Sequence, residues 1–80
     1  MEYREAIKIL EKMHTAKVAD AEAKEARLEI LNAEYSAGDR EPDTVAAIKH
    51  TTDRAVTSRL EAEALSMAVV GLFRLEQLDK

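Results

Sequence analysis

The sequence predicts an all-α fold, an antiparallel hairpin of two long helices that we expect to assemble into a four-helix bundle or a higher helical oligomer. The 80 residues are rich in alanine and glutamate and contain only two glycines and one proline, a composition that favours helices. Apolar residues recur at helical spacing on both sides of a single break, and neither side alternates as a strand would. We therefore expect one domain over residues 1–80, with helices at 2–36 and 43–79 and a linker at 37–42.

The bulk composition excludes several classes of protein. The chain has no cysteine, which rules out disulfides and thiolate metal sites. Its net charge of −4 is shared evenly, with seven Lys or Arg against nine Asp or Glu in residues 1–40 and five against seven in residues 41–80. Because no basic face is segregated, duplex nucleic acid is not an expected partner.

No segment has the features of a membrane or export signal. The most apolar stretch, residues 65–75, is shorter than the roughly 20 residues that span a bilayer. The first five residues are mostly charged and no apolar run follows them, unlike a secretory signal peptide. We therefore expect a cytoplasmic protein that does not insert into membranes, and we expect it to need no cofactor.

The helix predicted over residues 2–36 carries one apolar stripe, with alanine-rich positions in its middle. Small side chains allow helices to approach closely but bury little area. On the opposite face, Asp20 and Lys24 have the spacing of a favourable ion pair within one helix. The stripe contains Tyr3, Ile7, Leu10, His14, Val18, Ala21, Leu28, Leu31 and Tyr35.

The break between the helices has the residues of a tight connection. Gly38 suits the left-handed conformation that ends many helices, and Pro42 suits the first turn of the next helix. Either Glu41 or Asp43 then lies at the start of that helix, and Asp43 is the better capping residue. Because the linker is short, the helices must run antiparallel, which pairs residue i with about residue 79 − i and places Leu10 opposite Val69.

The helix predicted over residues 43–79 is apolar on more than one side. Nine of the eleven residues at 65–75 are apolar if Gly71 is counted, and a helix of this kind must be covered on more than one face. We expect Gly71 on the inner stripe, where a leucine would overpack the helix contact. That inner stripe is expected to contain Val45, Ile48, Thr52, Val56, Leu60, Glu63, Met67, Val70, Arg74 or Leu75, and Leu78.

A second apolar set is left over at the open end of the hairpin. Exposed apolar patches usually mark interfaces, and a domain this small commonly needs a staple or an oligomer for stability. We therefore predict a non-enzymatic protein–protein interaction module of the adaptor, chaperone or inhibitor type, without catalytic residues. It would self-associate, most simply as a homodimer, or clamp another protein, or both. The predicted interface residues are Ile9, Leu65, Val69, Leu72 and Phe73.

Two features resemble a known group of proteins. The Gly38-Asp39 linker and the apolar helix from Leu60 to Leu78 resemble the small helical-hairpin partner proteins of type III secretion systems. This resemblance implies a hairpin whose apolar second helix holds an aggregation-prone subunit. It covers only these two features of the chain.

Two polar residues on the expected stripes allow two structural interpretations, and other polar residues suggest an alternative function. His14 and Glu63 lie at the centres of the two expected stripes. They form either a partly buried charged pair, which would fix the register, or two groups at the stripe edges that reach water. The alternative function is an oligomeric binder of an anionic, nucleotide-like ligand near Tyr3, Arg4 or Arg54, since arginine matches phosphate oxygens.

A metal-binding bundle is the second alternative function. Glu11 and His14 have the i,i+3 spacing that puts a carboxylate and an imidazole on one face in di-metal four-helix bundles. A homodimer would supply two such pairs, with Glu61 or Glu63 as further ligands. Such a spacing also arises in any glutamate-rich helix, where it leaves a solvated carboxylate beside a histidine of the stripe.

Overall fold

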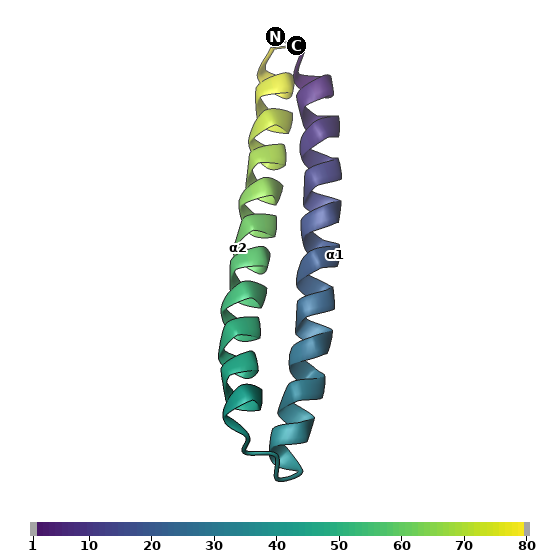
Figure 1. Ribbon diagram of the computed structural model, residues 1–80. Coiled ribbons are helices and arrows are strands. Elements are labelled where there is room, and N and C mark those ends of the chain that lie inside the picture. Colours follow the sequence, from purple (N-terminus) through teal and green to yellow (C-terminus); the bar gives the residue numbers. More distant parts are fainter. Residues whose placement is uncertain (1, 80) are drawn as a thin grey trace.

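The computed structural model describes residues 2–79, which form two long helices and one short connection. Helix α1 covers Tyr3–Ser36 and helix α2 covers Pro42–Leu78. The helices lie side by side and antiparallel, so that both chain ends meet at one end of the molecule (Figure 1). The molecule is a rod of 60 × 15 × 13 Å. The predicted all-α hairpin is confirmed, and the observed helix starts and the end of α2 differ from the predicted ones by one residue.

Helix α1 ends in a glycine-dependent cap. Gly38 has a φ of 114°, a left-handed conformation that side chains with a Cβ disfavour. The Gly38 N–H donates to the Tyr35 carbonyl at 3.1 Å, and the Asp39 N–H donates to the Glu34 carbonyl at 3.0 Å. These two bonds are those of a Schellman motif. Arg40 also donates to the Tyr35 carbonyl and lies over the Tyr35 ring, 3.7 Å from its centroid. The expected role of Gly38 is therefore confirmed.

Helix α2 begins one residue earlier than expected. Pro42 occupies its first turn and Glu41 is the N-cap residue, so the capping role expected for Asp43 is wrong. The reason is that proline has a fixed φ and holds the residue before it in an extended conformation. Asp39 organises this start from the linker, because its carboxylate accepts hydrogen bonds from the Glu41 N–H at 3.0 Å and the Thr44 hydroxyl at 2.9 Å.

Each helix buries one line of residues against the other, which we call the seam. The steps along it alternate between three and four residues, the spacing of a left-handed coiled coil. In α1 the seam contains Tyr3, Ile7, Leu10, His14, Lys17, Ala21, Lys24, Leu28 and Leu31. The expectation that Lys24 lies on the opposite face is therefore wrong, because its amine bonds Ser58 of α2, and Tyr35, expected on the stripe, is exposed. In α2 it contains Thr44, Ile48, Thr51, Ala55, Ser58, Ala62, Leu65, Val69, Leu72 and Glu76.

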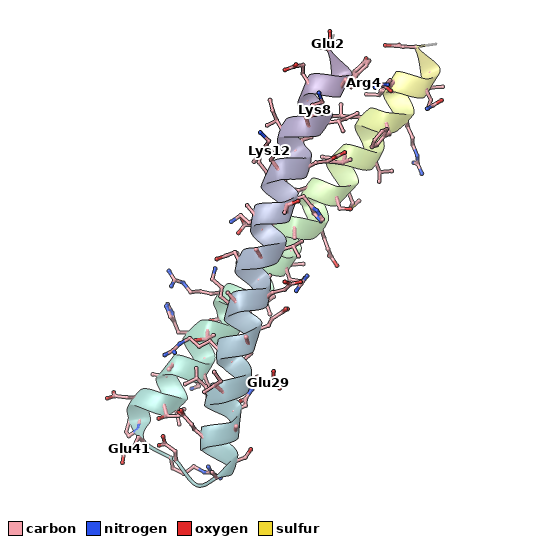
Figure 2. All side chains as sticks on the ribbon, turned by 90° about the vertical axis from the view of Figure 1, so that its right-hand side faces the viewer. Glu2, Arg4, Lys8, Lys12, Glu29 and Glu41 are labelled. Carbon is pink, nitrogen blue, oxygen red and sulfur yellow. The ribbon has the colours of Figure 1, made fainter. Side chains whose placement is uncertain are left out.

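The pairing of the helices agrees with the register expected from the short linker. The contacts of Asp20 with Ser58, Lys17 with Glu61 and Arg4 with Glu76 each lie within one residue of that pairing. Figure 2 shows Arg4 beside α2, whereas Lys8 and Lys12 project from the outer surface of α1.

The inner stripe expected for α2 is wrong over most of its length. Val56, Leu60 and Met67 are exposed, and smaller residues lie against α1 in their place. The physical reason is the composition of the facing helix, where two long side chains, Lys17 and Lys24, are half-buried in the middle of the seam. Large residues opposite them would overpack the contact. The small residues at the centre of the α2 seam are Thr51, Ala55, Ser58 and Ala62.

Gly71 also lies on the other side of α2 from where the sequence predicted it. It is exposed, and a Cβ added to it would meet no atom within 4 Å. The expected overpacking by a larger residue therefore does not apply within the hairpin. The remaining effect of Gly71 on stability is the loss of conformational entropy when a glycine is ordered in the middle of a helix.

We expect Gly71→Ala to stabilise the chain by up to about 1 kcal/mol, the difference in helix propensity between the two residues. Urea unfolding followed by circular dichroism measures the change. Gly38→Ala is the matched control, and it should destabilise because an alanine there would be held at positive φ. A loss of stability in Gly71→Ala, measured at concentrations where the chain is monomeric, would contradict the exposed position of this residue in the hairpin.

Candidate functional site

Helix α2 has a second apolar line on its solvent side, which we call the outer stripe. Its apolar members are Val56, Leu60, Met67 and Val70, whose exposed fractions are 54%, 59%, 74% and 47%. Two further positions at the same spacing, Glu63 and Arg74, are charged and exposed. The outer stripe thus repeats the coiled-coil spacing of the seam, but residues 2–79 leave it uncovered.

The structure divides the predicted interface residues between two surfaces. Leu65, Val69 and Leu72 are half-buried on the seam, where they face α1. Ile9 and Phe73 are exposed, at 58% and 46%. Whether any of them contacts another molecule stays a prediction. For the three seam residues, such a contact could use only the part that α1 leaves uncovered.

A polar cluster occupies the middle of the seam. The Ser58 hydroxyl is almost fully buried, with the residue 2% exposed. It donates to Asp20 Oδ2 at 2.7 Å and accepts from Lys24 Nζ at 2.9 Å. Lys24 Nζ also lies 2.6 Å from Asp20 Oδ2. The hydrogen bond from Lys24 lowers the pKa of Asp20 most, and the hydrogen bond from Ser58 lowers it further. The cluster therefore keeps a charged carboxylate at the helix contact.

Two ion pairs flank this cluster. Arg59 donates through Nε to Glu25 Oε2 at 3.2 Å and through Nη2 to Glu25 Oε1, a two-pronged geometry that is among the stronger side-chain contacts. The hydrogen bond from Arg59 lowers the pKa of Glu25. Lys17 Nζ lies 2.8 Å from Glu61 Oε2, and this bond raises the pKa of Lys17. These contacts join polar residues of α1 to polar residues of α2. Matching polar residues across the two helices is therefore the feature of the sequence that could have located the seam.

The residues proposed for an anionic ligand lie in two distant places. Arg4 Nη2 is 3.6 Å from Glu76 Oε1 at the open end of the hairpin. The negative charge of Asp79, and a hydrogen bond to it, raise the pKa of Tyr3. Arg54 lies in the other half of the rod, about 30 Å away at 1.5 Å per helical residue. The hairpin therefore does not bring Arg54 together with Tyr3 and Arg4.

The other polar residues singled out by the sequence are also separated. His14 is half-buried on the seam and Glu63 is exposed on the outer stripe. No ion pair joins them within residues 2–79. In the same described range, no group of three or more His, Asp or Glu side chains could hold a metal ion. Glu61, suggested as an additional ligand, is paired with Lys17.

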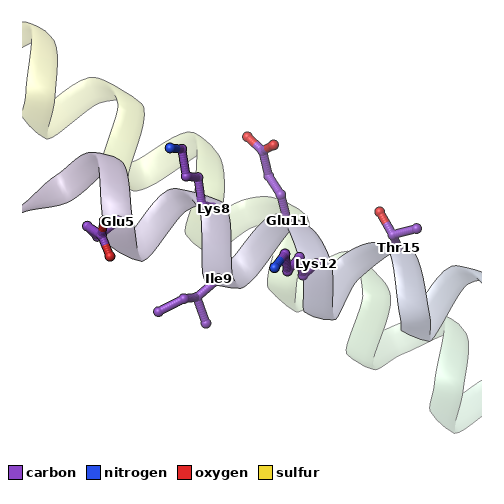
Figure 3. A pocket seen from close by; sticks show the side chains of 6 residues that line it. All are labelled: Glu5, Lys8, Ile9, Glu11, Lys12 and Thr15. Carbon is purple, nitrogen blue, oxygen red and sulfur yellow. The ribbon is translucent and has the colours of Figure 1, made fainter.

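A shallow hollow on α1 is shown in Figure 3. Its side chains diverge, because Lys8 and Glu11 extend from one side of the helix and Ile9 from the other. All its lining residues come from one helix, so the feature is the convex surface of α1. They are Glu5, Lys8, Ile9, Glu11, Lys12 and Thr15.

Comparison with known proteins gives no relative. No protein-family model matches the chain, and neither the curated proteins nor the solved structures contain a significant match. Over residues 2–79, neither helix has a stretch long and apolar enough to cross a bilayer. The surfaces of the hairpin are therefore the basis for a functional proposal.

We expect Ser58→Leu to destabilise the hairpin by about 1–3 kcal/mol through overpacking, and Ser58→Ala by about 1 kcal/mol through loss of its hydrogen bonds. Chemical denaturation measures both. Thr57→Leu is the matched control. Thr57 is next to Ser58 in the chain but is exposed, and leucine is a good helix former. Equal effects of leucine at positions 57 and 58 would contradict the seam.

The low pKa values of Asp20 and Glu25 predict that stability falls in acid. Because both carboxyl groups have folded-state pKa values below their unfolded ones, the unfolded chain binds more protons. Their contribution is complete above the unfolded-state pKa values, that is above a pH of about 5, and is lost as the pH falls through the folded-state values. Urea unfolding between pH 7 and pH 2 measures the loss.

The double variant Asp20→Asn with Glu25→Gln should be less stable at pH 7 and lose less stability in acid. Glu29→Gln is the control, because Glu29 is exposed and forms no ion pair within residues 2–79. A double variant with the full acid sensitivity of the unmodified chain would show that the two pairs do not cause it.

Proposed function

We propose that the chain is a non-enzymatic protein–protein interaction module that self-associates through the outer stripe of α2. One observation carries this proposal: α2 presents Leu60, Met67 and Val70 to solvent at the spacing that its buried seam uses. A helix with two such lines has one more face than a single partner helix can cover. Exposed apolar patches usually mark interaction sites.

The exposed area of the hairpin supports the same proposal. The chain has a solvent-accessible surface of 5935 Å². A compact monomer of 8.9 kDa would expose about 4,800 Å² by the usual scaling with mass. The hairpin thus exposes about 1,100 Å² more, which exceeds the approximately 800 Å² that each partner buries in a standard interface. Self-association would remove part of this exposed area from water and stabilise the fold by mass action.

The anionic-ligand alternative has less support. A shallow surface hollow beside Arg54 is lined by Lys17 and Lys24, but Glu61 and Asp20 already neutralise these two lysines. The metal-binding alternative would need ligands from a second copy. The cytoplasmic location and the lack of a nucleic acid partner stay predictions from composition.

Paired substitutions on the two lines of α2 test the proposal. We expect Met67→Glu with Val70→Glu to dissociate the oligomer while leaving a helical hairpin, because both side chains are exposed in the isolated chain. Val69→Glu should instead unfold the hairpin, since it places a charge in the seam. Sedimentation equilibrium over micromolar concentrations measures the mass, and circular dichroism measures the helix content.

Thr15→Glu controls for the added charge, because Thr15 is exposed on α1 and lies away from both lines of α2. A folded 8.9 kDa monomer at every concentration of the unmodified chain would contradict self-association. In that case a different protein would have to cover the outer stripe.

A further inference from the structure

We infer that two copies of this chain pack their outer stripes antiparallel about a twofold axis, with Glu63 of each copy against Arg74 of the other. This inference rests on the proposed self-association and adds its surface, orientation and register. It commits to a second copy as the occupant of the outer stripe from Leu60 to Arg74.

The charges of the outer stripe carry the inference. From Val56 to Arg74, the positions at coiled-coil spacing include only two charged residues, Glu63 and Arg74. Arg74 forms no ion pair within residues 2–79. The hydrogen bond to Glu25 is the main cause of the raised pKa of Arg59. The charge of Glu63 makes the smallest contribution to that pKa, from a distance. Both charges therefore need a partner if this face is covered, because an unpaired buried charge is strongly unfavourable.

Among pairings of two outer stripes about a twofold axis, only one brings both charges of each copy against opposite charges. Parallel packing in register would place Glu63 against Glu63 and Arg74 against Arg74. An antiparallel contact centred on Glu63 would also bring the two glutamates together. When the twofold axis passes between Met67 and Val70, Glu63 meets the Arg74 of the other copy, and each Met67 meets a Val70. The twofold axis then generates both ion pairs from one.

The same register matches large and small residues beside the stripe. On one flank, Phe73 falls near Ser66 of the second copy, so the exposed ring gains a small neighbour. On the other flank, Gly71 falls near Ala64, and two small residues allow the helices to approach closely. All four residues are exposed in the hairpin. The interface would thus have an apolar centre of methionine and valine with an ion pair at each end, about 16 Å apart by residue number along each helix.

Charge reversal tests the register. We expect Glu63→Arg alone and Arg74→Glu alone each to raise the dimer dissociation constant by about tenfold or more, because each places like charges together. The double variant Glu63→Arg with Arg74→Glu should return the constant to near that of the unmodified chain. Sedimentation equilibrium of the full chain measures all four constants. Glu29→Arg, on the outer surface of α1, controls for the change in net charge.

Each outcome is decisive. Restoration by the double variant, with unchanged helix content by circular dichroism, supports the antiparallel register. A dimer whose double variant is as weak as the single variants overturns the register and leaves the proposed self-association standing. A monomer at every concentration of the unmodified chain overturns both proposals.

Discussion

Each helix of a two-helix hairpin can bury only one face, and this limit determines which residues of the chain lie inside. The seam of α1 has leucines and an isoleucine towards its two ends, whereas its middle contains Lys17, Ala21 and Lys24. The seam of α2 likewise has its apolar residues towards the ends, and it has alanine, serine and threonine in the middle. Lysine stems can lie along small apolar side chains while their amines reach polar partners. The hairpin therefore buries little apolar area at its centre and uses hydrogen bonds there.

These central contacts give the hairpin its register. A slip of the helices by one heptad would keep apolar residues on the seam, because the repeat is unchanged. It would, however, separate Ser58 from Asp20 and Lys24, and leave a buried hydroxyl without its two partners. Unsatisfied buried polar groups are unfavourable by about 1–3 kcal/mol. The short linker with its Gly38 cap selects the same register, so local and long-range contacts agree.

The sequence was sufficient for the parts of the fold that depend on local chemistry. Helix content follows from composition, the linker from Gly38 and Pro42, and the apolar ends of the α1 seam from a single apolar stripe. The centre of that seam was not predicted, because Lys17 is absent from the expected stripe and Lys24 was expected on the opposite face. The inner face of α2 was assigned wrongly because its two lines have the same spacing and the outer one has the larger residues. Hydrophobicity favours Leu60 and Met67 over Ala55 and Ser58. Ala55 and Ser58 lie inside because of the residues that α1 places opposite them. Periodicity within α2 alone does not contain that information.

A rotation of α2 about its own axis would bury the outer stripe against α1, but charged residues oppose it. Such a rotation would place Arg74 in the apolar end of the seam near Ile7, without a carboxylate on the facing line. It would also break the contacts of Arg59 with Glu25 and of Ser58 with Asp20. Charged residues within an apolar line thus act against the alternative hairpin. The same two charges, Glu63 and Arg74, restrict what can cover the stripe from outside, because a partner must supply one charge of each sign at the matching distance. A second copy in the antiparallel orientation carries that pair on the same line of its own α2.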